Sequence, residues 1–530
     1  MNNRLFSHIK NLLLPCLAFS IIAGFLSAII ITAFKLAAEE VIHLSGKVYE
    51  TVRDNPKWLV VLVLGIAAIG FLSSCILSKS RSCRGGGIPT SVAAVCGIVN
   101  FNWAASIFVL PFSALLSFFC GLPLGTEGPC VQMGAAIGNG VVGYLGNEKQ
   151  KSWRRYIMTG GASAGFSIAT ASPISAIIFS MEELHKRFSP LLLSVVSISV
   201  MSAEATLQML SLVGIKSGSL FHLPEIGTIA PTLLFAPLVV GLVCGVSSVL
   251  FTRLYHAVEK TVRSVLNKIS IKIIFPILFA SISLVGFFLA DTLGSGHSLV
   301  EAIIQRKTVW FMIILVFLIR ALTMMISNTA GVTGGVFLPT LAFGAILGSL
   351  SAEGMIALGW IGSEHYMLMV TLGIAAFLGA TSRIPLTACV LAIEALAGIN
   401  NVLAIIIAVT ISFIVVELSG LEDLTDIMIA AKVRSINKGK KASVIEVPLT
   451  AKENSFAVGK EIRDILWPNS CVVVSFERSH ENHGSVGVFE GDVITVHYKT
   501  INPAATAKEL TLLMGEQSEE VNRIMNPSLE

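Results

Sequence analysis

Long apolar runs dominate this chain and limit what it can fold into. Hydrophobic residues make up 54% of its 530 residues and charged residues only 13%, whereas about 25% of a soluble protein is charged. An α-helix needs roughly 20 apolar residues to cross a bilayer, and several runs come near that length: Leu13–Phe34, Trp58–Leu77, Pro190–Val213, Leu233–Phe251 and Val402–Val416. With shorter runs there are more than ten apolar segments. We therefore predict an all-α, multi-pass membrane protein, and a transporter or channel rather than an anchored enzyme.

One carboxylate, Glu127, stands in a glycine-rich interruption of these runs. Gly125, Gly128 and Pro129 surround it, and Pro129 suits the first turn of a following helix. Such a break exposes backbone N–H groups at a helix start, which attract anions. A carboxylate at membrane depth is costly and marks a functional candidate. We predict an anion site with Glu127 as a negative group that competes for it. The alternative is an ordinary helix start at the membrane surface.

The glycine-rich break belongs to an internal duplication. Two patterns recur at offsets of 210 and 212 residues: Pro129-x4-Gly134-Ala-x2-Gly138 as Pro339-x4-Gly344-Ala-x2-Gly348, and Thr159-x-Gly161, Pro173 and Glu182 as Thr371-x-Gly373, Pro385 and Glu394. Corresponding broken helices in two repeats indicate the binding site of a transporter. The repeats are predicted at roughly 10–215 and 227–430, with the second half of the site at Gly334–Pro339. The pattern leaves open whether the halves are inverted.

Another break, Gly85–Pro89, follows Arg81–Arg84 and opens an apolar helix. Its three glycines suit a close approach of backbone to a ligand. A tight turn between two helices is the alternative interpretation.

Ionisable residues at the ends of apolar segments are further candidates. Glu182 and Glu183 end one segment beside His185–Arg187. Either they are interfacial charges that cap a helix and pair with these bases, or one is a proton relay reached from the cytoplasm. Arg320 and Glu394 are expected to be buried structural charges. His297 is expected to be a structural residue in a loop.

The composition changes near residue 436. Residues 436–530 hold 23 charged residues, against 47 in the preceding 435. We predict a membrane domain, 1–435, and a small soluble α+β domain, 436–530, after the basic linker Lys438–Lys441. Its predicted elements are strands at Val444–Leu449, Cys471–Phe476 and Val493–Tyr498 and a helix at Val458–Leu466. The positive-inside tendency places the basic loops and this domain in the cytoplasm.

Several function classes are disfavoured. The nine cysteines lack CxxC spacing and nearby histidines, so we predict neither disulfides nor a metal site. No HExxH or GxSxG motif stands in a suitable setting, so we predict neither an enzyme nor a cofactor. The net charge of +4 gives no reason to expect a nucleic-acid partner. Cation transport needs carbonyls or carboxylate rings, whereas the breaks here present helix starts.

Four motifs together resemble those of the CLC family of chloride channels and chloride/proton antiporters, in its prokaryotic form: Gly85-Gly-Gly-Ile-Pro89, Gly125-Thr-Glu-Gly-Pro129, Glu182-Glu183 and Gly334-Gly-Val-Phe-Leu-Pro339. The resemblance covers roughly residues 10–435. It implies a homodimer in the cell membrane, with chloride and protons as the transported ions. Each subunit would hold its own anion pathway, built from two inverted repeats of short, tilted and broken helices.

The resemblance also assigns roles by position. Glu127 is similar to the external gating glutamate of the family, and Glu183 to its internal proton-transfer glutamate. The positions implied for the anion site are Gly86, Gly87, Ile88, Val336, Phe337 and Thr425.

Three departures from the family pattern concern this site. Gly86 replaces a serine whose hydroxyl contacts the central anion, Thr126 replaces an arginine of the gating motif, and Thr425 aligns with the inner-gate tyrosine. A hydrogen bond to an anion contributes about 1.5–3 kcal/mol. We therefore expect a weaker or less selective central site, and the preferred anion stays open.

Chloride/proton antiport is the leading prediction, because Glu127 and Glu183 supply both ends of the family's proton path. The alternative is a passive or weakly coupled anion channel, since the altered inner gate could open the pathway. Family channels often lack the inner glutamate, which favours antiport.

The soluble tail resembles a TrkA C-terminal type regulatory module at Val458–Arg463, Cys471–Phe476 and Glu490–His497. The resemblance implies cytoplasmic regulation by a small-molecule ligand. A dimer-stabilising appendage is the alternative.

Overall fold

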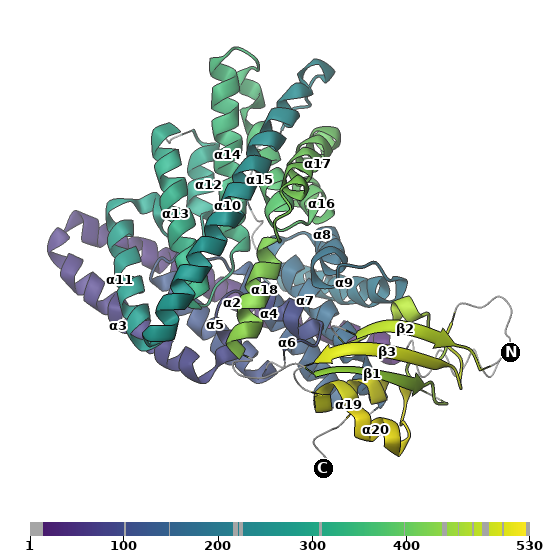
Figure 1. Ribbon diagram of the computed structural model, residues 1–530. Coiled ribbons are helices and arrows are strands. Elements are labelled where there is room, and N and C mark those ends of the chain that lie inside the picture. Colours follow the sequence, from purple (N-terminus) through teal and green to yellow (C-terminus); the bar gives the residue numbers. More distant parts are fainter. Residues whose placement is uncertain are drawn as a thin grey trace.

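The computed structural model describes residues 14–99, 102–147, 149–215, 221, 226–306, 310–396, 398–436, 443–453, 455–468, 471–479, 487–500 and 503–525. Most of this length is helical, and a small sheet lies at the C-terminal end of the chain (Figure 1). The helical part comprises the described residues of 14–436, and the C-terminal module those of 443–525. That the two are separate domains stays a prediction.

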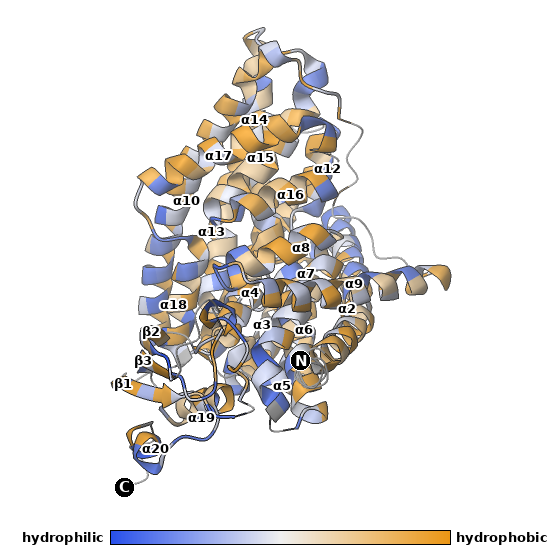
Figure 2. Cartoon of the chain, turned by 90° about the vertical axis from the view of Figure 1, so that its right-hand side faces the viewer, coloured by the Kyte–Doolittle hydropathy of each residue, from blue (hydrophilic) through white to orange (hydrophobic). Residues whose placement is uncertain are grey.

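The helical part consists of two successive sets of helices. The first is α2 (Leu14–Asp54), α3 (Leu59–Lys79), α4 (Gly87–Val95), α5 (Trp103–Phe119), α6 (Glu127–Leu145), α7 (Arg154–Thr170), α8 (Pro173–Phe179) and α9 (Pro190–Leu212). The second is α10 (Phe235–Lys268), α11 (Ile271–Phe288), α12 (His297–Ile304), α13 (Trp310–Ala330), α14 (Phe337–Ala357), α15 (Tyr366–Thr381), α16 (Pro385–Ala395), α17 (Val402–Leu418) and α18 (Leu424–Ile436). Among the described residues, nine helices are long and apolar enough to cross a membrane, and Figure 2 shows the apolar colour along most of this part.

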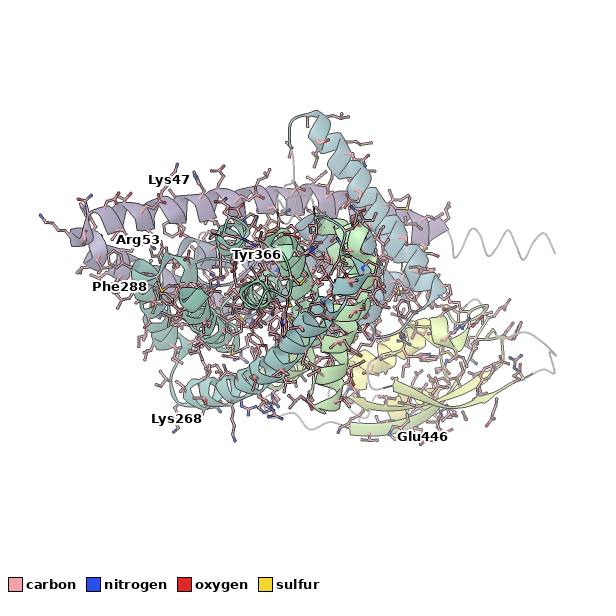
Figure 3. The ribbon with its side chains drawn as sticks, turned by 90° about the horizontal axis from the view of Figure 1, so that it is seen from above. Lys47, Arg53, Lys268, Phe288, Tyr366 and Glu446 are labelled. Atoms are coloured by element: carbon pink, nitrogen blue, oxygen red, sulfur yellow. The ribbon has the colours of Figure 1, made fainter. Side chains whose placement is uncertain are left out.

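Two of these helices extend well beyond the runs that predicted them. The run Leu13–Phe34, whose Leu13 lies outside the described residues, begins α2, which continues to Asp54; Leu233–Phe251 begins α10, which continues to Lys268. Helices longer than the bilayer is thick have to tilt or project from it. Seen from above, α2 runs along one side of the helical part towards Lys47 and Arg53, and the module with Glu446 lies on the opposite side of the view (Figure 3).

The repeated glycines mark crossings at which two helices touch backbone to backbone. A Cβ atom built on Gly134 of α6 would lie 2.0 Å from the carbonyl oxygen of Gly161 in α7. In the second half, a Cβ on Gly344 of α14 would lie 2.5 Å from the carbonyl oxygen of Gly373 in α15. No side chain fits at either crossing, which explains why the pattern occurs in both halves.

The two halves meet on a local two-fold axis. Gly125 and Gly335 are 210 residues apart, the offset of the repeat, and they form an isolated antiparallel bridge. The N–H of each donates to the carbonyl of the other, both at 2.7 Å. Reciprocal bonds between equivalent residues are what a two-fold rotation produces. The two repeats are therefore related by a two-fold rotation at this point, which the sequence pattern alone did not show.

The same symmetry governs a pair of carboxylates. Glu182 accepts from the N–H groups of Leu386 and Thr387 at the start of α16, at 3.0 and 2.7 Å. Glu394 accepts from the equivalent N–H groups at the start of α8, those of Ile174 and Ser175, at 3.0 and 2.9 Å. Each glutamate thus caps the short helix of the other repeat. Glu182 therefore caps a helix and does not pair with the neighbouring bases. Glu394 has the expected structural role, although it is only half-buried.

Arg320 is fully buried and donates to the backbone carbonyls of Asp291, Leu293 and Gly294, in line with the structural role predicted for it. The prediction of a loop at His297 was wrong. Gly296, at φ +107°, ends the preceding loop, and His297 is the first residue of α12.

The C-terminal module contains an antiparallel sheet of β1 (Ser443–Thr450), β2 (Cys471–Glu477) and β3 (Val493–Thr500) in the order β1-β3-β2. The sheet confirms the predicted strands, each with one or two further residues. Helices α19 (Pro503–Met514) and α20 (Glu519–Met525) complete the described module. The linker Lys438–Lys441 lies outside the described residues.

The prediction of a helix at Val458–Leu466 was wrong. Gly459 has φ +83°, a left-handed conformation that interrupts a helix. Val458 pairs with Val488 in an isolated β-bridge, and only a short 3-10 turn, Ile462–Asp464, follows. Of the apolar residues whose spacing suggested a helix, Val458 thus pairs within the module, and Ile465 and Leu466 are buried.

This segment attaches the module to the helical part. The hydroxyl of Tyr156, near the start of α7, donates to the carbonyl of Asp464 and accepts from the N–H of Leu466 at 3.0 Å. Ser189, before α9, donates to the Asp464 carboxylate at 2.7 Å. The module therefore rests on α7 and on the α8–α9 connection, beside the basic loops that were expected on its side of the membrane.

Lys460 makes this attachment sensitive to pH. It lies 3.5 Å from the ring centre of Phe456 and 5.6 Å from that of Trp153, and burial lowers its pKa to about 7. An exposed lysine has a pKa of about 10. Between about pH 7 and about pH 10 the docked lysine is therefore less protonated than an exposed one, so the docking equilibrium constant rises with pH, by at most about tenfold per pH unit. We expect the melting temperature of the purified protein to rise from pH 7 to 9. The rise should vanish in Lys460→Met; a flat wild-type profile would contradict this.

Candidate functional site

The starts of α4, α6 and α14 meet inside the helical part. A Cβ atom built on Gly87 would lie 1.7 Å from the carbonyl oxygen of Gly128, and one on Gly128 would lie 2.8 Å from the Cα of Gly335. Only glycine permits such backbone contact. The first N–H groups of a helix have no preceding turn to bond to, and its dipole makes that end partly positive. The structure thus brings the three glycine-rich breaks together, and the free N–H groups of the three helix starts make this region electropositive.

Glu127 is the first residue of α6, and its side chain is 1% exposed. A Cβ built on Gly125 would touch both the Glu127 Oε2 atom, at 2.4 Å, and the Cβ of Leu338, at 3.0 Å. The carboxylate therefore lies beside the first turn of α14, where the N–H of Leu338 faces it. Thr126 donates to Oε1 at 3.4 Å, a long contact, while Oε2 has no hydrogen-bond partner among the described residues.

The positions named for the anion site gather here, with one exception. Gly86 caps α4, whose first residues are Gly87 and Ile88, and Val336 caps α14, whose first residue is Phe337. A Cβ built on Gly86 would lie 3.4 Å from the carbonyl oxygen of Gly334, so the two starts are adjacent.

Thr425 is the exception, because its side chain is joined to Glu183. Glu183 is buried in the π-helical turn Ser180–Leu184 after α8, and the Thr425 hydroxyl, at the start of α18, is its hydrogen-bond partner. Lys186 pairs with Asp423 at 2.8 Å and with Asp426 at 2.7 Å beside them. Of the basic residues that follow Glu183 in the sequence, Lys186 thus pairs with carboxylates at the α18 start.

A stack of aromatic rings lies between the region of Glu127 and the region of Glu183. Phe166 of α7 stacks on Phe179 of α8 with ring centres 4.3 Å apart and meets Phe337 of α14 edge-on at 5.1 Å. Phe179 lies four residues before Glu183. Nothing in the sequence around these three residues indicates that their rings meet here.

These features define a class of protein: a membrane transport protein whose symmetry-related repeats bring broken helices together around a buried carboxylate. The family model described as voltage-gated chloride channel matches residues 69–417, well over half of the chain. The chain belongs to this family and is a multi-pass membrane protein.

Relatives and solved structures agree with this assignment. The H(+)/Cl(-) exchange transporter ClcA of Vibrio cholerae is 27% identical over 427 residues, covering 76% of this chain and 86% of the relative; that of Vibrio parahaemolyticus is 25% identical over 408 residues, covering 75% and 86%. The fold matches that of a slow cyanobacterial Cl-/H+ antiporter with a TM-score of 0.72, 23% identity and coverage of 80% and 99%. A CLC-type fluoride/proton antiporter matches with a TM-score of 0.61, 20% identity and coverage of 75% and 94%.

Proposed function

We propose that this protein exchanges chloride for protons across the cell membrane. The observation that carries the proposal is the buried Glu127 carboxylate at the joint start of α4, α6 and α14. The names of its relatives as H(+)/Cl(-) exchange transporters support it.

Glu127 acts as a gate that an anion and a proton control together. Its charged carboxylate lies beside the first turn of α14, where a bound anion would sit. Two negative charges a few ångströms apart repel, so charged Glu127 and the anion compete for the same N–H groups. When Glu127 binds a proton its charge is lost, and the anion takes the position. The proton then leaves to the opposite side from the anion.

Glu183 passes protons between this gate and the cytoplasmic side. Of the adjacent pair, Glu182 has both carboxylate oxygens engaged in capping α16, whereas Glu183 is buried next to the α18 start. The rings of Phe166, Phe179 and Phe337 keep the two glutamates in separate surroundings, so that anion and proton use different routes on this side.

A passive or weakly coupled anion channel is the alternative. Thr425 is much smaller than the tyrosine expected at the inner gate, and its hydroxyl is directed to Glu183. If that leaves the inner opening unguarded, anions pass without proton exchange.

Proton movement in liposomes carrying the purified protein, under an imposed chloride gradient, tests the proposal. Uphill proton transport supports antiport. Chloride flux without proton movement supports the channel, and absence of chloride flux calls for the same assay with fluoride and nitrate.

The anion site should gain affinity when a hydroxyl is supplied at position 86. The backbone of Gly86 is extended, with φ −72°, and an added Cβ would have Asn328 Nδ2 as its nearest atom, at 3.3 Å, so serine fits with a small adjustment. One more donor to an anion is worth about tenfold in affinity. We expect Gly86→Ser to bind chloride about tenfold more tightly in titration calorimetry. Equal affinity would remove the idea of a weakened site.

The homodimer is proposed on the apolar face of α8, α9, α16 and α17. Large side chains there are exposed: Ile174, Leu193, Met201, Leu386, Leu403 and Ile406. This face lies over the reciprocal caps of α8 and α16, which make it rigid.

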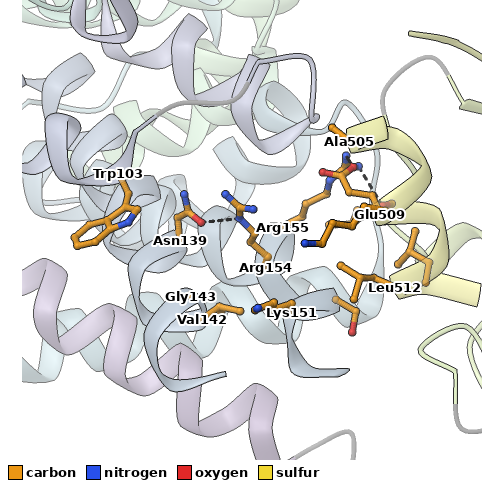
Figure 4. A pocket seen from close by; sticks show the side chains of 14 residues that line it. Trp103, Asn139, Val142, Gly143, Lys151, Arg154, Arg155, Ala505, Glu509 and Leu512 are labelled. Carbon is orange, nitrogen blue, oxygen red and sulfur yellow. Dashed lines mark hydrogen bonds and ion pairs between the residues drawn. The ribbon is translucent and has the colours of Figure 1, made fainter. Parts of the chain in front are cut away.

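The C-terminal module is proposed to lie in the cytoplasm and to regulate transport; its TrkA-like character stays a prediction. Between it and the helical part lies a cavity of about 370 Å³. Its wall includes Lys151, Arg154, Arg155 and Lys508, and Figure 4 shows Arg154 paired with Asn139 on one side and Arg155 with Glu509 of α19 on the other. A small anionic ligand of the module fits this setting.

A further inference from the structure

A buried amide next to the start of α4 lacks a hydrogen-bond partner. Asn328, in the last turn of α13, is 8% exposed. Its Oδ1 atom accepts from the hydroxyl of Tyr255 at 2.7 Å, but its Nδ2 atom has no acceptor among the described residues. An unmade hydrogen bond of this kind costs about 1–3 kcal/mol, so such a donor calls for a functional explanation.

The unpaired donor is directed at the anion site. The nearest atom to a Cβ built on Gly86 is Asn328 Nδ2, at 3.3 Å. The amide nitrogen thus lies next to the position that a side chain of residue 86 would take, close to the start of α4.

Tyr255 fixes the direction of this amide. It is 2% exposed on α10, and the Asn328 Oδ1 atom is the acceptor for its hydroxyl. Because the oxygen is held on the Tyr255 side, the NH2 group turns toward α4.

We propose that the side-chain amide of Asn328 donates a hydrogen bond directly to the transported anion, with Tyr255 as its positioning residue. The inference rests on the proposed function and adds a side-chain donor to a site otherwise built from backbone N–H groups. An amide N–H2 is neutral at all relevant pH values, so this contact does not titrate, unlike that of Glu127. It also supplies a side-chain contact at the place where Gly86 has none.

Equilibrium titration of chloride into the purified full-length protein tests this. Asn328→Leu, which removes the donor, and Asn328→Asp, which keeps the size but offers only acceptors, should each lower chloride affinity at least about tenfold. Asn401→Leu is the matched control: Asn401 is also buried, but its Oδ1 atom accepts from the N–H of Ile229 and its Nδ2 atom donates to the carbonyl of Gly227, outside the anion site. Its chloride affinity should be unchanged.

Two further variants separate a direct contact from a structural role. Tyr255→Phe should lower chloride affinity several-fold while Asn328 is still present. Gly86→Ser should restore much of the affinity in the Asn328→Leu background, because its hydroxyl would stand near the lost amide; a packing defect would not be rescued in this way.

Unchanged affinity in the two Asn328 variants, or loss without rescue by Gly86→Ser, would overturn the inference. Neither result affects the proposed function, which fails separately if the wild-type protein moves no protons under a chloride gradient.

Discussion

Glu127→Gln is expected to reduce proton movement under a chloride gradient to the leak rate of protein-free liposomes, while chloride flux continues. Glutamine is nearly the same size, but it carries no charge and binds no proton at this position. The anion then meets no competitor at the α14 start, so exchange becomes simple anion flow. Proton uptake and chloride efflux, recorded on the same liposomes with a pH electrode and a chloride electrode, give the two rates.

A matched carboxylate variant controls for general damage. Glu394→Gln changes the same group in the helical part, but Glu394 caps α8 and lies outside the proposed site. It should keep proton–chloride coupling. Proton pumping that survives in Glu127→Gln would contradict the role given to Glu127, and equal losses in both variants would point to damage of the fold.

The meeting of the glycine-rich breaks could be predicted because backbone contacts at glycine leave a strong pattern in the sequence. Gly87, Gly128 and Gly335 leave no room for a Cβ atom. Glycine is therefore required at these positions, and the glycine-rich breaks in the helices can be recognised from the sequence alone. The repeat offset similarly predicted that Gly125–Pro129 and Gly334–Pro339 belong together. Their two-fold relation could be seen only from the reciprocal bonds between Gly125 and Gly335.

Contacts between distant side chains could not be predicted in the same way. Glu182 and Glu183 are adjacent and chemically identical in sequence, yet one caps α16 and the other is buried beside Thr425. Asn328 is one polar residue at the end of an apolar run. Only its position beside Gly86 in the structure identifies it as a candidate for the anion site. The segment Val458–Leu466 has helix-like spacing, but it is not helical because Gly459 is left-handed and Val458 pairs with Val488. Local periodicity does not register such a contact with a distant residue.

Attachment of the C-terminal module gives the second large expected effect. Arg155, at the start of α7, is 9% exposed. It donates to the carbonyls of Leu466 and Trp467, at 3.3 and 2.7 Å, and pairs with Glu509 of α19. Each hydrogen bond from a charged donor to a carbonyl contributes about 1.5–3 kcal/mol, whereas the ion pair adds less because the Glu509 side chain is 38% exposed. Arg155→Gln should therefore weaken docking by two orders of magnitude or more and expose residues 455–468 to hydrogen exchange.

Arg154→Gln is the natural control for this variant, because Arg154 is the neighbouring residue of equal charge but bonds to Asn139 within the helical part. It should leave exchange at residues 455–468 unchanged. If docking carries regulation, Arg155→Gln should alter transport in the same direction as deletion of residues 440–530. If both leave transport and its response to ligands unchanged, the module does not regulate, and its contacts with α7 and α9 serve stability alone. Since Tyr156 and Ser189 attach the same segment close to the turn that carries Glu183, a change in proton–chloride coupling is the effect to seek first.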